Sequence, residues 1–163
     1  MNLWKKIDEN LEVYIIVPLL IGMSFLIFFQ VIMRYVFQSS LIWSEELSRY
    51  LFIWLVYISV SYTAKQEKHI RIDAAFYLFP KHLRPYVELF SDILILVFSV
   101  FIVFTSVTVV GKIAWSGQMS PALHLHMEYV YLATLVGFVL TTYRTLQTIH
   151  RKVKNFIAKK EAN

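Results

Sequence analysis

The chain has 163 residues, of which 58% are hydrophobic, and it carries a formal net charge of +5. Soluble domains contain about 45–50% apolar residues, so this composition excludes an ordinary soluble protein, and we expect no separate soluble domain in these residues. The absence of cysteine excludes disulfides, thiol catalysis and cysteine metal ligands. Lys and Arg flank the apolar segments, where they commonly set membrane topology, so the positive charge does not indicate binding to nucleic acid.

Four apolar segments contain no Asp, Glu, Lys, Arg or His, and they occupy residues 13–33, 50–64, 93–111 and 129–143. A hydrocarbon core of about 30 Å requires about 20 helical residues. The first and third segments reach this length alone, and the others reach it with their flanks. The sequence therefore predicts an all-α polytopic membrane protein, a single domain covering residues 1–163. Its four expected transmembrane helices lie at about 13–33, 44–64, 92–111 and 126–146.

The first span is preceded by an amphipathic stretch, residues 3–11, which predicts a short helix at the membrane interface. The span is too long for a cleavable signal sequence, so we expect a retained anchor. Pro18 and Gly22 predict a kink that assists packing. At its far end, Arg34 is expected to reach toward the interface, whereas the Gln30 amide, one turn further in, needs a hydrogen-bonding partner.

The second span begins with a polar cluster. Ser44 is a candidate N-cap, with Glu45 and Glu46 in the favourable first turn of the helix. Glu45 and Arg49 are four residues apart and are expected to form an ion pair. From spacing alone, a solvated helix start is a better interpretation than a docking cluster.

The loop between the second and third expected spans is the longest and carries His69, Arg71 and Asp73. Asp73 can cap a short interfacial helix, residues 74–79, which Pro80 ends. Spacing alone favours a polar loop with a helix cap over a binding motif.

Past the fourth span, residues 147–160 predict a basic amphipathic helix along anionic headgroups. With four spans, thirteen Lys and Arg residues lie on the side of the two termini and three lie on the opposite side. The positive-inside rule then places both the N-terminus and the C-terminus in the cytoplasm.

Several functional classes lack the residues that they require. The histidines lie in loops or at helix ends, which disfavours haem ligation within the bilayer. A proton-coupled small exporter needs an acidic residue well inside its first span, and the only candidate, Glu12, lies at the very edge of that span. No nucleophile–base pair, phosphate loop or metal-ligand spacing indicates an enzyme. A transporter subunit, a self-contained small four-span transporter and a stand-alone membrane assembly factor stay open on this evidence.

Three stretches in order resemble one family. Gln30-Val31-Ile32-Met33-Arg34-Tyr35-Val36-Phe37, the stretch from Trp43 to Trp54 (WSEELSRYLFIW) and His69-Ile70-Arg71-Ile72-Asp73 are similar to the small, DctQ-like membrane subunit of tripartite ATP-independent periplasmic (TRAP) transporters. One departure is that Ile58 and Ser59 stand where that family often has a glycine that permits close helix packing.

The resemblance implies an accessory or scaffold subunit in a bacterial inner membrane, bound tightly to a large multi-span TRAP subunit that carries the sodium sites. A periplasmic binding protein would deliver an organic acid, for which sialic acid is preferred to a C4-dicarboxylate. No cofactor is expected in this chain, and the lipid bilayer is its other partner. The residues expected to dock on partners are Gln30, Arg34, Tyr35, Trp43, Glu45, Glu46, Arg49 and Lys112, with His69, Arg71 and Asp73 as an inner-loop motif.

Overall fold

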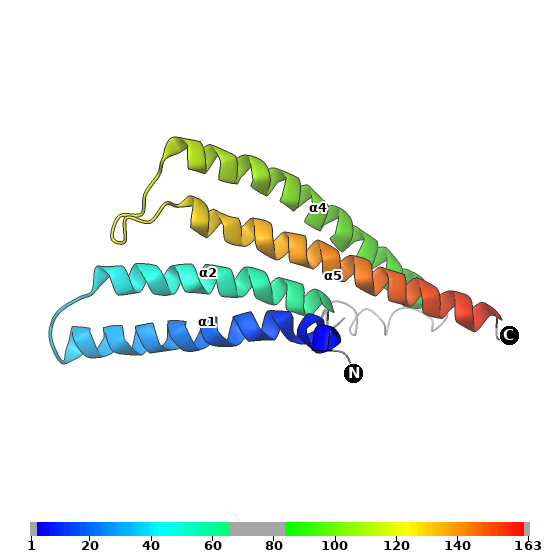
Figure 1. Ribbon diagram of the computed structural model, residues 1–163, viewed down its shortest axis with the longest axis horizontal. Helices are drawn as coiled ribbons and strands as arrows, with labels where there is room; N and C mark the ends of the chain where they lie inside the picture. The colour runs from blue at the N-terminus through cyan, green and yellow to red at the C-terminus, as the bar shows by residue number, and fades with distance from the viewer. Residues whose placement is uncertain (1–2, 66–83, 162–163) are drawn as a thin grey trace.

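The computed structural model describes residues 3–65 and 84–161 and is all-helical there, as the sequence predicts. The long polar loop with His69, Arg71 and Asp73, and the short helix expected after it, lie outside the described residues. The described helices are α1 (Leu3–Tyr35), α2 (Ile42–Lys65), α4 (Arg84–Ser116) and α5 (Glu128–Glu161) (Figure 1).

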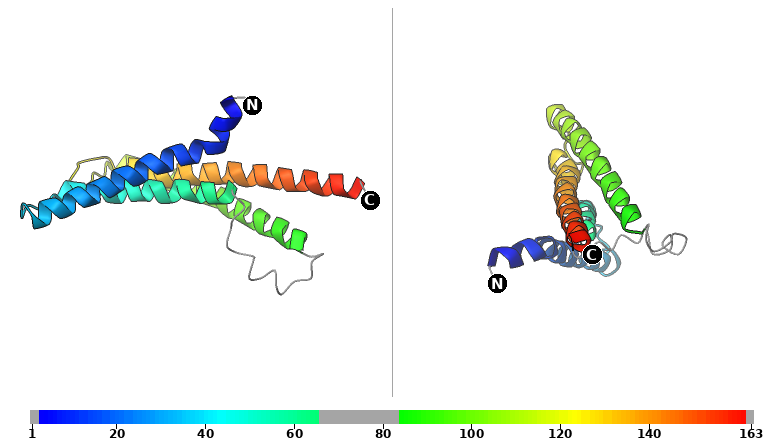
Figure 2. Two further views of the ribbon diagram at one scale, coloured as in Figure 1. Left: turned by 90° about the horizontal axis from the view of Figure 1, so that it is seen from below. Right: turned by 90° about the vertical axis from the view of Figure 1, so that its right-hand side faces the viewer.

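These helices lie in a row in the order α1, α2, α5, α4. The main contacts among them join α1 to α2, α2 to α5, and α5 to α4. Neighbours are antiparallel except for α2 and α5, which run in the same direction, and α1 and α4 lie at opposite edges (Figures 1 and 2). The row is therefore an open layer rather than a closed bundle. We call the end with the α1–α2 and α4–α5 connections the loop end, and the opposite end the terminal end.

The two edge helices are the most apolar. Within α1, residues Leu11–Tyr35 have a mean hydropathy of 2.6, and within α4, residues Val87–Ser116 have a mean hydropathy of 2.9. Both are long and apolar enough to cross a membrane. In the part of the chain that the structure describes, α2 and α5 are not apolar enough to meet the same hydropathy criterion for a membrane span. Their lower hydropathy has a structural reason, because each of these inner helices packs against a neighbour on both sides.

Small residues fill the contacts between the helices. Ser61, Ser99, Thr141 and Ala133 are all buried. Buried hydroxyls commonly bond within their own helix: Ser99 Oγ donates to the Ile95 carbonyl at 2.7 Å and Thr141 Oγ1 to the Gly137 carbonyl at 2.8 Å. Such residues let helix backbones approach closely in a membrane, where apolar burial contributes little to helix association.

The closest approach joins α2 and α5. A Cβ added to Gly137 would lie 2.7 Å from the Tyr57 Cβ and carbonyl oxygen, so any larger residue there would overlap the α2 backbone. Although Ile58 and Ser59 stand where a glycine would permit close packing, α2 and α5 do pack closely, because the glycine that permits it lies on α5. Ile58 itself is 2% exposed.

The helix starts differ in detail from the sequence-based expectation. Ser44 is not an N-cap, because α2 already begins at Ile42. The Ser44 hydroxyl instead donates to the Leu26 carbonyl of α1 at 3.4 Å. The amphipathic residues before the first span are continuous with α1, which bends away from the row near its beginning (Figure 2). Pro18 lies inside the unbroken helix.

Candidate functional site

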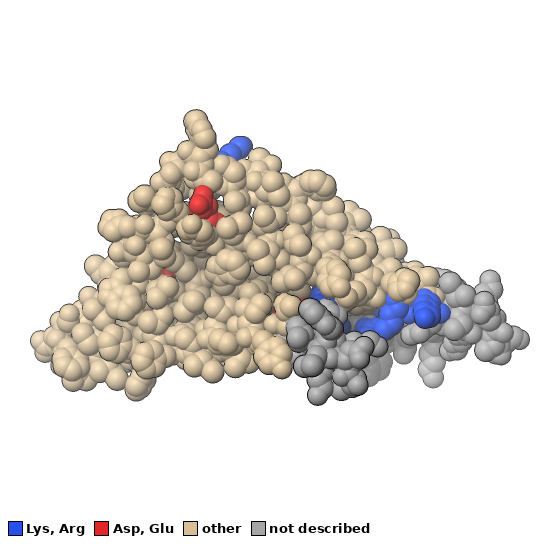
Figure 3. Space-filling view, viewed as in Figure 1, with Lys and Arg blue, Asp and Glu red and all other residues tan. Residues whose placement is uncertain are grey.

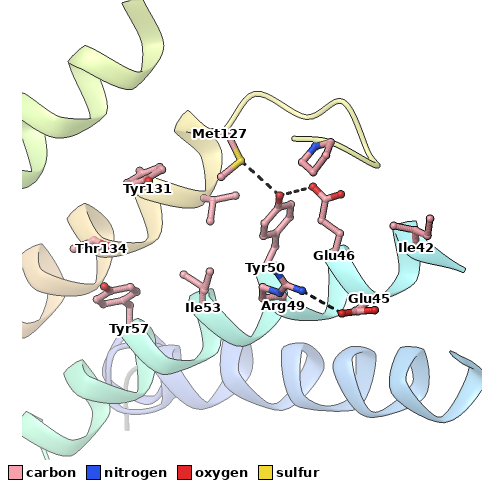
Figure 4. Close-up of a pocket in the computed structure, with 12 residues that line it drawn as sticks. Ile42, Glu45, Glu46, Arg49, Tyr50, Ile53, Tyr57, Met127, Tyr131 and Thr134 are labelled. Atoms are coloured by element: carbon pink, nitrogen blue, oxygen red, sulfur yellow. Dashed lines mark hydrogen bonds and ion pairs between the residues drawn. The ribbon is translucent and has the colours of Figure 1, made fainter. Parts of the chain in front are cut away.

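A buried carboxylate organises the loop end. Glu46 is 7% exposed, and its Oε2 accepts a hydrogen bond from the backbone N–H of Ala122 at 2.8 Å. Its Oε1 accepts a hydrogen bond from the hydroxyl of Tyr50, one turn further along α2 (Figure 4). The Tyr50 hydroxyl also lies 3.5 Å from Met127 Sδ. Glu46 therefore ties the α4–α5 connection to α2, and its carboxylate is occupied within the chain.

That connection, residues 117–127, has an ordered backbone. The backbone N–H of Ser120 donates to the Leu125 carbonyl at 2.8 Å, and Ser120 Oγ accepts a hydrogen bond from the Leu125 N–H at 3.2 Å. Met119 and His126 form an antiparallel bridge. Gly117 adopts a φ of 63° and His124 a φ of 51°, the left-handed values that allow the turn. Residues near Pro121 are thus held in a compact turn over α2.

A groove lies below this turn, between α2 and α5. It encloses about 580 Å³, with Glu45 and Arg49 at its rim. The expected ion pair is confirmed, since Arg49 Nη2 lies 3.2 Å from Glu45 Oε1. Both side chains are more than half exposed, so the pair contributes only about 0.3–0.5 kcal/mol. Other lining residues are Ile42, Glu46, Tyr50, Ile53, Tyr57, Pro121, Met127, Val130, Tyr131 and Thr134.

The remaining docking candidates lie at the loop end but do not form one cluster. Arg34 and Tyr35 are exposed at the end of α1, whereas Lys112 is exposed on α4 at the opposite edge of the row. Trp43 is exposed in the first turn of α2. Gln30 is half-buried, and its amide makes no hydrogen bond to any residue that the structure describes.

The terminal end contains an ion cluster that the sequence analysis did not identify. Glu12 is fully buried, and its Oε1 lies 2.5 Å from Nε of Arg144, which is itself buried. Arg144 Nη1 donates to Gln147 Oε1 at 2.9 Å, and Lys65 Nζ lies 3.6 Å from Glu12 Oε2. The signal was an acid directly before the first apolar segment and a base directly after the fourth, which a four-span arrangement would bring to the same membrane level.

A second ion pair joins α4 to α5 at this end. Lys152 Nζ lies 2.6 Å from Oδ2 of Asp92, which is 2% exposed, and 3.8 Å from Oε2 of Glu88. Lys and Arg side chains gather there in the space-filling view, and a broad surface without charge separates them from the few charges near the loop end (Figure 3). Among the described residues, no group of acidic or histidine side chains could hold a metal ion.

Comparison with known proteins gives a consistent result. Residues 23–155 match the family model of the DctQ component of tripartite ATP-independent periplasmic transporters. The chain is 30% identical over 139 residues to a Haemophilus influenzae protein described as a TRAP transporter small permease protein, covering 85% of this chain and 82% of the relative. It is 29% identical over 101 residues to the C4-dicarboxylate TRAP transporter small permease protein DctQ of Vibrio cholerae, covering 62% and 44%.

A third relative is longer. The chain is 28% identical over 154 residues to the isethionate TRAP transporter permease protein DctMQ of Oleidesulfovibrio alaskensis, covering 91% of this chain and only 24% of that protein. The family match covers most of the chain and agrees with the relatives. The chain thus belongs to the DctQ family of TRAP transporter components, and it is a membrane subunit of a transporter rather than an enzyme.

Proposed function

We propose that this chain is a scaffold subunit of a sodium-coupled TRAP uptake system in the bacterial inner membrane, bound tightly to the large permease subunit. In this proposal α1, α2, α4 and α5 all cross the membrane, and both termini face the cytoplasm. The DctMQ relative supports this partnership, because this chain corresponds to 24% of a longer permease polypeptide. In that relative, the region that matches this chain is thus part of one longer permease polypeptide.

The observation that carries the proposal is the open row of helices. A transporter that works as a single copy of this chain would have to surround its substrate path, but α1 and α4 lie at opposite edges of this layer (Figure 2). The buried acids Glu12, Glu46 and Asp92 already bind groups of the chain itself. A layer of this kind suits a support for another membrane protein better than an independent pump.

The substrate is proposed only by class. Relatives at 26–32% identity carry the names of isethionate, C4-dicarboxylate, ectoine and sialic acid transporters. Sialic acid is therefore one of several possible substrates, and the comparisons do not favour it. We propose that an organic acid and sodium bind to the large subunit, and that a periplasmic binding protein approaches the loop end of the complex.

The test is purification of the tagged chain from native membranes in a mild detergent. We expect a large multi-span permease to co-purify in equal amount, whereas a four-helix membrane protein from another family with the same tag should not retain it. Recovery of the folded chain alone would favour a stand-alone assembly factor. Substrate uptake by vesicles that contain only this chain would establish a self-contained transporter and contradict the proposal.

A further inference from the structure

We propose that one transmembrane helix of the large subunit docks in the groove between α2 and α5, and that this helix presents hydrogen-bonding side chains and a basic residue. The inference rests on the proposed function and specifies which surface of the row meets the partner. The groove of about 580 Å³ is lined by Glu45 and Arg49 near the loop end and reaches as far as Tyr57 and Thr134 (Figure 4).

The edges of the row have a surface suited to lipid. On α1, Phe25 and Phe28 are exposed, and on α4, Phe101 and Phe104 are exposed. The hydroxyls on the exposed side of α4 are bonded to their own helix, as for Thr105 Oγ1, which donates to the Phe101 carbonyl at 3.0 Å. Acyl chains can cover such surfaces without leaving a polar group unsatisfied.

The groove differs because most of its hydroxyls have no hydrogen-bonding partner in the described part of the chain; the exception is that of Tyr50, which donates to Glu46. The hydroxyls of Tyr57, Tyr131 and Thr134 make no hydrogen bond to any residue in the described part of the chain. A polar group at membrane depth is costly without a partner, and an acyl chain offers none. A helix with Ser, Thr, Asn or Gln side chains satisfies these hydroxyls, which is a common form of contact between membrane helices.

The charged residues at the rim of the groove favour a partner helix with a positive charge. Two carboxylates, those of Glu45 and Glu46, accompany the single guanidinium of Arg49. Glu46 is held by the turn above it, whereas Glu45 and Arg49 are both more than half exposed. A Lys or Arg on the partner helix can therefore pair with Glu45 and balance the excess negative charge. This complementarity favours a protein helix over an anionic lipid headgroup.

The chain has no cysteine, so single-cysteine variants can be spin-labelled at one position. We would label Thr134→Cys in the groove and Phe101→Cys on the exposed side of α4. The two positions lie at similar depth, because Phe98 and Phe138, each about one helical turn away, have ring centroids 6.1 Å apart. Label mobility and oxygen accessibility would be measured by electron paramagnetic resonance with and without the large subunit.

The large subunit is expected to immobilise the label at position 134 and to lower its oxygen accessibility severalfold, while the label at 101 stays mobile in lipid. Unchanged oxygen accessibility at 134 in the intact complex would mean that lipid fills the groove and would overturn the inference. Immobilisation at 101 alone would place the partner on α4 and would also overturn it. If the unmodified chain retains no large subunit at all, the proposed function fails instead.

A second experiment removes the hydroxyls without changing the groove's shape. The combined variant Tyr57→Phe, Tyr131→Phe and Thr134→Val should weaken retention of the large subunit by about tenfold, as expected for a few lost interhelical hydrogen bonds. The helicity and monodispersity of the variant chain report its folding. Unchanged retention by a folded variant would contradict the predicted hydrogen-bonding partner.

Discussion

At the scale of single residues, the packing of α2 against α5 depends on one residue that has no side chain. Gly137 meets the backbone of Tyr57 so closely that an added Cβ would lie 2.7 Å from it. Interfaces with so little space respond to a single methyl group, because the backbone of a packed helix cannot move without its neighbours. Glycine at this position has a packing role rather than a conformational one.

The variant Gly137→Ala should lower the free energy of unfolding by about 1–3 kcal/mol, since the methyl group overlaps the α2 backbone. Gly111→Ala is a matched control, because a Cβ there meets nothing within 4 Å and alanine favours the helix. Denaturation in detergent, followed by circular dichroism, compares the two. Equal or greater stability of Gly137→Ala would contradict the close approach.

At the scale of helices, two ion pairs attach the edge helices to α5 near the terminal end. Glu12 joins α1 to Arg144, and Asp92 joins α4 to Lys152. The carboxylates are almost completely buried, so each needs its partner more than a surface acid would. These pairs fix how far along α5 each edge helix lies.

Replacing the basic partner of a buried carboxylate should therefore lower the free energy of unfolding more than replacing an exposed base. We expect Arg144→Met to lower the free energy of unfolding by about 3 kcal/mol, because the Glu12 carboxylate loses its closest cation and keeps the more distant Lys65. The double variant with Glu12→Gln should recover part of this loss. Exposed Lys154 provides the control Lys154→Met, and an equal effect of the two single variants, measured by chemical denaturation in detergent, would refute the role of the pair.

At the scale of the whole molecule, the face seen in Figure 3 has an uncharged surface between the charges at the terminal end and a few charges at the loop end. The terminal end carries most of the described Lys and Arg, including Lys65, Arg144 and Lys152. The positive-inside rule predicts that this end faces the cytoplasm. The groove rim and the compact turn of residues 117–127 would then face the periplasm.

Reporter fusions test this orientation. Green fluorescent protein fused after the last residue should fluoresce, since the C-terminus is expected in the cytoplasm, and alkaline phosphatase fused there should be inactive. A truncation that places alkaline phosphatase at Gly117 should be active. The opposite pattern would show that the positive-inside rule is overridden and that the groove opens toward the cytoplasm.

The sequence by itself determined the features that depend on local pattern: the all-helical class, the apolar segments of α1 and α4, the Glu45–Arg49 pair and the resemblance to the DctQ family. Helical periodicity and hydropathy extend over a few turns, so a short window contains them. The start of α2 was misplaced at Ser44 because a serine before two acids is a common cap, and the contact with Leu26 that holds it instead is not local.

Only the tertiary structure decided the order of the row, the contact of Gly137 with Tyr57, and the pairing of Glu12 with Arg144 across 132 positions. It also showed that Glu46, a predicted docking residue, binds the backbone of the turn that covers the groove. The physical reason is that an apolar helix can pack on any of its faces. Which faces meet depends on the small side chains and buried charges of all four described helices together.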